Sequence, residues 1–167
     1  MEFRHEWKHN INMSDMISIR PRLRAVMQPD EHAENGKYEI RSLYFDSLFD
    51  KALREKLDGV NIREKFRIRY YNGDTSYILL EKKYKRGSLG SKTNALMTEE
   101  EAQKITDGHF DWMQGHKEPL IRELYDKMTM QGLRPKTIVD YTREPYTYPP
   151  GNVRITIDYH IHTGLFH

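Results

Sequence analysis

The residues with the clearest chemical potential form a short row of cations in the middle of the chain. Between Asn61 and Tyr71 the sequence reads Asn-Ile-Arg-Glu-Lys-Phe-Arg-Ile-Arg-Tyr-Tyr. If this segment is a β-strand, alternate side chains share a face. One face then carries only cations, and the other carries mainly apolar and aromatic groups: Arg63, Lys65, Arg67 and Arg69 against Ile62, Phe66, Ile68 and Tyr70.

Two interpretations of this row remain open on the segment alone. Neighbouring cations repel each other, so an unbroken row indicates a surface that holds an anion, and ligands with several phosphates fit best. Charged runs are also common on the solvated outer face of a sheet. If the row binds a triphosphate, replacing Arg67 and Arg69 with alanine should abolish binding, and relief of repulsion should leave the fold intact or slightly more stable.

Composition narrows the classes of protein that fit. The 167 residues suit one domain, 1–167, with its own apolar core. There is no cysteine, so disulfides, thiolate metal sites and a cysteine nucleophile are excluded. The N-terminal segment lacks the apolar core of a signal peptide and no apolar run approaches the roughly 18 residues of a membrane span, so we expect a cytoplasmic protein. The net charge of +2 is not that of a strongly basic nucleic-acid binder.

Hydrophobic periodicity and turn residues predict the elements that position these side chains. Strands are expected at about 2–12, 38–45, 61–71, 76–85, 136–146 and 152–160. Helices are expected from Ser14 or Asp15 to Met27, from Asp46 to Gly59, from Thr98 to Ile105 and from Pro119 to Gly132. Asn72-Gly73 suits a type I′ turn, and the glycine- and serine-rich segment 87–93 is expected to be a flexible loop or a sheet edge that carries Lys92.

Apolar stripes at helical spacing indicate the buried faces of three expected helices. In chain order they are Ile19, Leu23, Val26 and Met27, then Phe49, Ala52, Leu53 and Leu57, then Leu120, Ile121, Leu124 and Met128. Several strands likewise carry a charged face opposite an apolar one. We therefore predict an α+β fold in which a closed or nearly closed antiparallel barrel has its charged faces inside and its helices packed outside.

A series of motifs runs in order along nearly the whole chain: Glu6-Trp7-Lys8, Ser42-Leu43-Tyr44-Phe45-Asp46, Arg67-Ile68-Arg69-Tyr70-Tyr71, Leu80-Glu81-Lys82-Lys83, Tyr141-Thr142-Arg143 and Pro150-Gly151-Asn152-Val153-Arg154-Ile155-Thr156-Ile157-Asp158. Together they resemble the VTC domain, the polyphosphate polymerase domain of the vacuolar transporter chaperone complex, which is also found in bacterial proteins. That family is one of the triphosphate tunnel metalloenzymes, or CYTH-like proteins. The resemblance implies a tunnel of antiparallel strands lined by basic residues.

The resemblance also implies a reaction and its residues. The terminal phosphoryl group of ATP would pass to a growing polyphosphate chain with the help of a divalent metal, manganese or magnesium. The implied catalytic residues, which bind the triphosphate, are Arg67, Arg69, Lys83, Arg143 and Arg154. The implied further phosphate ligands are Lys8, Lys65, Lys85, Lys92 and Tyr141. The candidate metal carboxylates are Glu6 and Glu81, although Glu6 fits equally well as a salt-bridge partner of Arg4 or Lys8.

One departure from the family concerns the C-terminal edge of the barrel. Family members continue with a strand that carries a metal-binding Glu-x-Lys motif and with a terminal helix, whereas this sequence stops at Gly164-Leu165-Phe166-His167. We expect a barrel that is incomplete at this edge. A second copy or a partner chain would then complete it, because an open strand edge favours pairing.

Polyphosphate synthesis is the leading function on these grounds, and two alternatives stay open. One is a triphosphatase of the same superfamily, and the other is a non-catalytic module that binds polyphosphate or another polyanion. Whether the chain is an enzyme is therefore undecided. Nucleic acid is a less favoured ligand, because the cations lack a clear set of stacking aromatic side chains.

Overall fold

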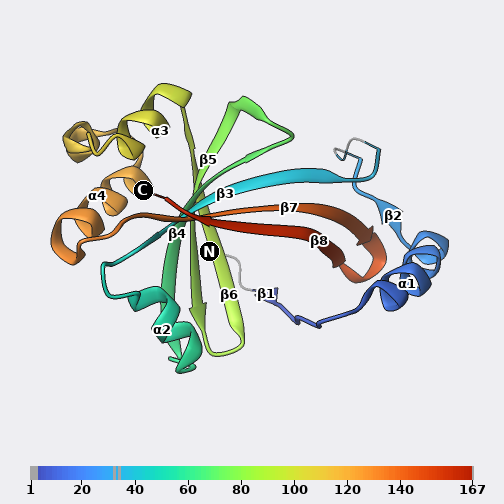
Figure 1. The fold of residues 1–167 in the computed structure, drawn as a ribbon. Helices are drawn as coiled ribbons and strands as arrows, with labels where there is room; N and C mark the ends of the chain where they lie inside the picture. The colour runs from blue at the N-terminus through green and yellow to red at the C-terminus, as the bar shows by residue number, and fades with distance from the viewer. Residues whose placement is uncertain (1–3, 32, 34, 167) are drawn as a thin grey trace.

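The computed structural model describes residues 4–31, 33 and 35–166, and its main feature is one curled antiparallel sheet (Figure 1). The strands are β1 (Arg4–His5), β2 (Gln28–Pro29), β3 (Tyr38–Asp46), β4 (Ile62–Tyr71), β5 (Asp74–Arg86), β6 (Leu89–Met97), β7 (Arg134–Tyr148) and β8 (Val153–Leu165). The helices are α1 (Met13–Val26), α2 (Lys51–Leu57), α3 (Glu99–Thr106) and α4 (Pro119–Gln131), with the short 3-10 helices η1 (Asp111–Gly115) and η2 (Pro149–Gly151). No helix in these ranges is long and apolar enough to span a membrane.

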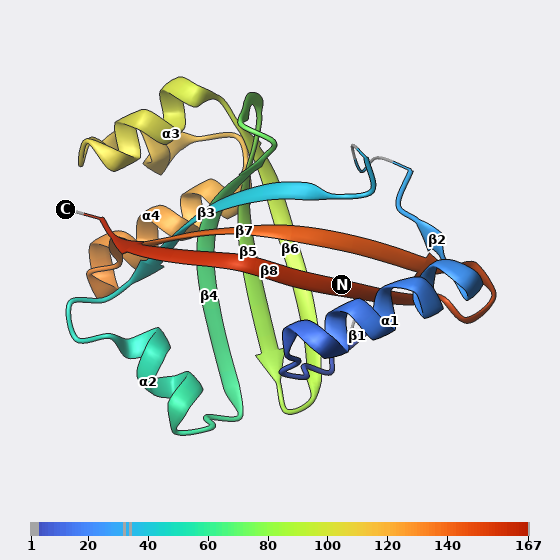
Figure 2. The ribbon, with the colours of Figure 1, turned by 45° about the vertical axis from the view of Figure 1, so that its right-hand side comes forward.

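The strands lie in the order β1-β6-β5-β4-β3-β7-β2, and β8 pairs with β7 outside this path. The sheet curls into a half-barrel with its helices on the outer side (Figures 1 and 2). Within the part of the chain that the structure describes, β6 and β8 do not pair with each other. The predicted α+β fold with outer helices is confirmed, and the barrel is open rather than closed.

Local sequence explains where several elements begin and end. Asn72 and Gly73 have φ angles of 53° and 71°, as a type I′ turn requires, and they join β4 to β5. The side chain of Thr98 accepts from the Glu101 amide in a capping box at the start of α3. Gly132 ends α4 in the left-handed region at φ 66°. These predicted turn and helix boundaries are confirmed.

The main core lies between the outer face of the sheet and helices α3 and α4. It joins Phe66 and Ile68 of β4 to residues of β5 and β6 and to the predicted stripe of α4: Ile78, Leu80, Ala95, Met97, Leu120, Ile121, Leu124 and Met128. The apolar face of β4 is therefore turned towards the helices, as its period of two predicts. Its cations consequently lie on the inner, concave face of the half-barrel.

A smaller core holds α1 against the outer face of β7 and β8. Met16, Leu23 and Met27 pack there against Tyr146 and Ile157. The predicted stripe of α1 is only partly right, since Val26 is exposed. The helix is capped by Asn12, in a capping box with Asp15, and not by Ser14 or Asp15.

Of the two alternatives for 87–93, a flexible loop and a sheet edge, the structure excludes the flexible loop. Gly87, with a φ of 61°, forms a tight turn, and the following residues form β6 along β5. Glycine and serine make the strand hard to recognise, but alternate residues of it are buried: Ala95 and Met97 belong to the main core and Ser91 is buried as well, while Lys92 contacts Glu81 on the inner face. The strand predicted at 2–12 is also too long: only Arg4–His5 is a strand among its described residues, and 2–3 lie outside the described residues.

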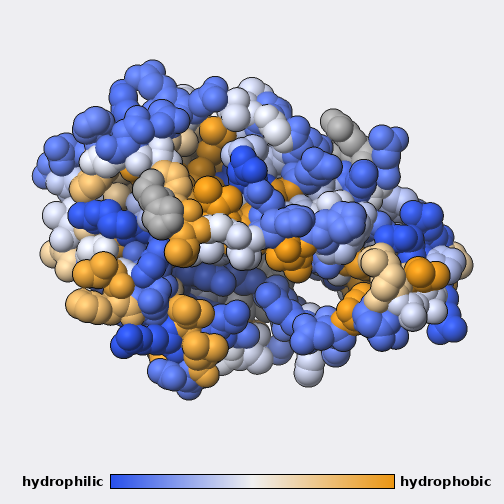
Figure 3. All heavy atoms as spheres, in the orientation of Figure 1, coloured by the Kyte–Doolittle hydropathy of each residue, from blue (hydrophilic) through white to orange (hydrophobic). Residues whose placement is uncertain are grey.

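The predicted stripe of α2 is wrong. Phe49, Leu53 and Leu57 are 72%, 48% and 73% exposed, and none of the residues of α2 is buried. Apolar side chains accordingly show on the outer surface over α2 at the lower left of Figure 3. Asp50 is the N-cap residue of α2 and its side chain makes no capping hydrogen bond, but the Asp46 carboxylate does accept from the amide of Ala52 in the first turn, at 2.8 Å. Residues that mark the start of a helix therefore do not show that its apolar face is buried.

Candidate anion-binding site

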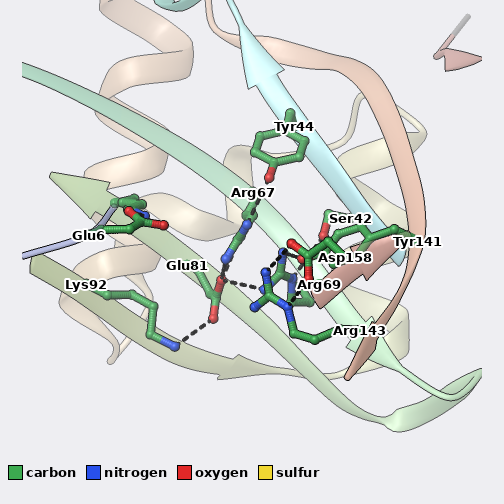
Figure 4. Close-up of polar contacts among 11 residues, drawn as sticks. Glu6, Ser42, Tyr44, Arg67, Arg69, Glu81, Lys92, Tyr141, Arg143 and Asp158 are labelled. Carbon is green, nitrogen blue, oxygen red and sulfur yellow. Dashed lines mark hydrogen bonds and ion pairs between the residues drawn. The ribbon is translucent and has the colours of Figure 1, made fainter. Parts of the chain in front are cut away.

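The centre of the inner face is a buried carboxylate surrounded by cations. Glu81 on β5 is only 1% exposed and lies opposite Arg67 on β4. Its Oε2 is 2.6 Å from Nε and 2.5 Å from Nη2 of Arg67, and its Oε1 is 3.0 Å from Nζ of Lys92 on β6 (Figure 4). Nη1 of Arg69 lies 3.9 Å from Oε2. Three cations thus share one negative charge.

Neutral side chains on neighbouring strands fix the two arginines. Arg67 donates from Nη1 to the Tyr44 hydroxyl at 2.8 Å. Arg69 donates from Nε to Oγ of Ser42 at 2.9 Å and from Nη2 to the Tyr141 hydroxyl at 2.8 Å. A guanidinium has more N–H donors than these acceptors engage. The remaining donors of two rigid guanidiniums are therefore suited to bind phosphate oxygens.

The cluster extends to β7 and β8 through an aromatic side chain. The Tyr141 ring lies under the guanidiniums of Arg69 and Arg143, whose Cζ atoms are 5.8 Å and 5.3 Å from its centroid. Arg143 is held by Asp158 in a bidentate pair at 2.7 Å and 2.8 Å. Burial alone would lower the pKa of Arg143, but Asp158 outweighs it and the pKa lies above its ordinary value.

Lysines gather towards the other end of the inner face. Lys83 pairs with Glu6, and Lys8 lies 3.9 Å from the same carboxylate. Lys65 is directly opposite Lys83 in the β4–β5 register. Partial burial, together with repulsion from Lys8 and Lys83, lowers the pKa of Lys65 below its ordinary value. Lys85 belongs to this group too, because its charge helps to lower the pKa of Glu6.

The electrostatics of the centre favour the charged form of Glu81. Burial alone would raise the pKa of this carboxyl, but Arg67, Arg69 and Lys92 outweigh burial and the pKa lies below its ordinary value. Tyr44 behaves in the same way: burial opposes ionisation, yet Arg67 and Lys65 bring its pKa below the ordinary value. Both shifts show that cations outnumber anions around Glu81 and Tyr44 on the inner face.

The structure brings most of the predicted site residues together. The inner-face cluster comprises Lys65, Arg67, Arg69, Lys83, Lys92, Tyr141 and Arg143, with Glu81 at its centre. Arg154 lies apart from these contacts. Its side chain is half-exposed and pairs with Asp30 at 3.1 Å. Arg154 precedes Asp158 by four residues on β8, so the two residues are about 13 Å apart along the strand.

Sequence reasoning did not assign roles to Ser42, Tyr44 and Asp158. Ser42 and Tyr44 are two residues apart on the predicted strand 38–45, so the sequence predicts that they share a face. Their pairing opposite Arg69 and Arg67 depends on the β3–β4 register, which the sequence does not specify. Asp158 shares a predicted face with Arg154, but its partner Arg143 is defined only by the pairing of β7 with β8.

The candidate metal carboxylates are already engaged by cations. Both oxygens of Glu81 contact Arg67 or Lys92, and Glu6 contacts Lys83 and Lys8. The described part of the chain contains no group of three or more acidic, histidine or cysteine side chains that could hold a metal ion. A hard divalent cation needs several oxygen ligands, so these residues do not fit a metal site formed by the protein alone.

Comparisons with known proteins agree with this architecture. The family model described as VTC domain matches residues 3–165. A crystal structure of a candidate adenylate cyclase from Bacillus halodurans is similar over 98% of this chain and 71% of its own, with a TM-score of 0.57 and 12% sequence identity. At this identity the similarity concerns the fold alone. No curated protein matches the chain.

Proposed function

Because the chain belongs to the VTC domain family, we propose that its inner face binds ATP through the triphosphate and transfers the terminal phosphoryl group to polyphosphate. Family and fold support a triphosphate-binding tunnel. The finer assignment to polyphosphate synthesis is the proposal. It includes ATP and polyphosphate as the partners and the cytoplasm as the location.

The observation that carries the proposal is the excess of fixed cations around Glu81. Arg67, Arg69 and Lys92 surround this one carboxylate, and each arginine is held by neutral hydroxyl groups as well. Preorganised guanidiniums need no reorganisation when a charged group arrives, which is the main protein contribution to phosphoryl transfer. Arg143 and the lysines around Glu6 extend the cationic surface on either side, as a chain of phosphates requires.

The proposed phosphoryl transfer requires few other groups from the protein. The bond between the terminal phosphorus of ATP and its bridging oxygen breaks, ADP leaves, and a new bond forms to a terminal oxygen of polyphosphate. That acceptor oxygen is already anionic, so no general base has to remove a proton. Arg67 and Arg69 are the groups we assign to stabilising charge on the transferred phosphoryl group. Arg143 and Lys83 are assigned to aligning donor and acceptor phosphates.

Calorimetric titration with inorganic triphosphate and with polyphosphate, each with and without manganese or magnesium, tests the binding. In parallel, ATP is incubated with the protein and the products are separated on a gel. Binding accompanied by lengthening chains supports the proposal. Release of inorganic phosphate without chains would support a triphosphatase, binding without turnover would support a polyanion-binding module, and absence of binding under every condition would overturn all three.

A further inference from the structure

Helix α2 carries its apolar side chains on the side that faces solvent. Leu53 and Leu57 lie one turn apart and are exposed, and so are Leu48 and Phe49 in the turn directly before the helix. We call these four residues the α2 patch. The side of the helix that faces the protein lines a pocket of about 320 Å³ and carries small and charged residues instead: Lys51, Ala52 and Glu55. The polarity of α2 is therefore the reverse of that of an ordinary surface helix.

Two cations border the apolar side of the helix. With 3.6 residues per turn, Lys56 lies about 60° around the helix from Leu53 on one side, and Arg54 lies about 60° from Leu57 on the other. Neither Lys56 nor Arg54 forms an ion pair with any residue that the structure describes. The leucines thus lie between two positive charges that no carboxylate of the described chain neutralises.

The acidic residues nearby do not cancel these two charges. Asp50 pairs with Lys136 at 2.7 Å, and Glu55 lies on the pocket side of α2, 3.9 Å from the lysine four residues before it. Asp58 at the C-cap and Arg63 at the start of β4 add one charge of each sign. The surface of α2 therefore combines protruding apolar side chains with a surplus of positive charge.

The shape and charge of this surface favour one kind of partner. The side chains of the α2 patch protrude, and Leu48 is 80% exposed, so a rigid partner would need a matching groove, whereas a fluid bilayer deforms around them. A second copy of the chain docked through α2 would bring its own Arg54 and Lys56 against the same two cations. Anionic lipid headgroups offer the opposite charge directly beside an apolar phase.

We propose that α2 binds the surface of an anionic membrane. The α2 patch enters the boundary between headgroups and acyl chains, and Arg54 and Lys56 bind the headgroups. Figures 1 and 2 show α2 on the outer side of the half-barrel, so this contact leaves the inner face with its cation cluster uncovered. The inference is independent of the proposed function, because no inner-face residue takes part in it.

Sedimentation with lipid vesicles tests this contact. The wild-type protein should bind vesicles of equal parts phosphatidylcholine and phosphatidylglycerol, and bind pure phosphatidylcholine more weakly. Phe49→Ser with Leu57→Ser should lower the partition coefficient about a hundredfold, because two large apolar side chains no longer enter the bilayer. Arg54→Gln with Lys56→Gln should lower it about thirtyfold on the anionic vesicles and remove their advantage over the neutral ones.

A matched control comes from another helix. Ile17→Ser with Val26→Ser removes two exposed apolar side chains from α1 and should leave vesicle binding unchanged. The substituted side chains in all three double variants are exposed, so circular dichroism should show that each variant keeps its fold. An equal loss of binding in the α1 control and in Phe49→Ser with Leu57→Ser would overturn the proposal.

A fluorescent label on a single cysteine gives a second readout, because the chain has no cysteine of its own. The environment-sensitive fluorophore NBD on Leu57→Cys should emit more brightly and further to the blue on the anionic vesicles, and NBD on Ile17→Cys should not change. Inorganic triphosphate should not release the protein from the vesicles. Release would assign the lipid contact to the inner face, and absence of vesicle binding would overturn the proposal outright. A dimer that forms without vesicles and is lost in Phe49→Ser would overturn it in favour of a second copy as the partner.

Discussion

The outer and inner faces of the β4–β5 hairpin both carry cations, but the cations are neutralised to different extents. On the outer face Lys82 contacts Glu64 and Glu123, and Lys127 of α4 also contacts Glu64. Two lysines there face two carboxylates. On the inner face three cations, Arg67, Arg69 and Lys92, share one described carboxylate, that of Glu81. Balanced pairs serve to attach a helix, whereas a rigid surplus of one sign is suited to a ligand that brings the missing counter-charge.

The largest expected effect follows from removing the inner arginines. Arg67→Ala with Arg69→Ala should abolish detectable triphosphate binding in calorimetry, because it deletes both fixed guanidiniums. The structure changes the expectation for stability. Glu81 would remain buried with only Lys92 as a partner, so we expect a loss of about 3–5 kcal/mol in unfolding free energy rather than the slight gain suggested by the sequence.

A companion variant separates binding from stability in this experiment. Arg67→Ala combined with Glu81→Ala removes both members of the buried pair, so urea denaturation should show much of the lost stability restored. Triphosphate binding should stay weak in this variant. Retained high-affinity binding in either double variant would contradict the assignment of the inner face.

The next effect comes from two matched Arg–Asp pairs on opposite faces. Arg143 with Asp158 on the inner face and Arg41 with Asp140 on the outer face are both bidentate, with N–O distances of 2.7–2.8 Å. Arg143→Ala should weaken triphosphate binding by about tenfold, and Arg41→Ala should leave it unchanged. Equal losses in both variants would mean that the faces do not differ in the way we describe.

A smaller effect concerns pH. The pKa of Glu81 is lower in the folded protein than its ordinary value of 4.5, so its charge stabilises the fold fully above that value. The stabilisation is lost as the pH falls from 4.5 through the folded pKa. Glu81→Gln should therefore flatten the acid side of the stability profile measured by urea denaturation. A wild-type slope that survives in this variant would assign the acid sensitivity to other carboxylates.

The smallest expected effect is on the outer face. Lys82→Ala removes one of two lysines that contact Glu64 and should leave the affinity for triphosphate within experimental error. Its cost in unfolding free energy should be less than about 1 kcal/mol, as for partly exposed ion pairs. A tenfold fall in triphosphate affinity would show that the outer pairs contribute to the site.

Much of the fold could be predicted from the sequence, because charged and apolar residues alternate regularly in several strands. In β4 the alternation of Arg67 and Arg69 with Phe66 and Ile68 is enough to predict which face meets the helices. In β6 the small residues around Gly90 mask the same alternation, so the sequence left a loop and a sheet edge as alternatives there. The stripe of α2 was misassigned because periodicity shows that apolar residues share a face, but not that another element covers that face.

The site is less readable than the fold because it depends on register. The cations were predictable as types, but the partners that hold them lie on strands far away in sequence. Arg69 contacts Tyr141, 72 residues later, and no local pattern specifies that pairing. The central role of Glu81 as a shared counter-ion is likewise a product of β4, β5 and β6 lying side by side.

The connection of β4, β5 and β6 by two tight turns has a consequence for the order of assembly. Glu81 contacts Arg67 and Lys92, which are only 14 and 11 residues away, whereas the contact between Arg69 and Tyr141 must wait for β7. Contacts of short sequence separation form sooner, because they close smaller loops. Pulsed hydrogen exchange during refolding should therefore protect amides of β4–β6 before those of β7, and simultaneous protection would contradict this order. Glu81 would then neutralise its neighbouring cations while the nascent sheet still lacks its other half.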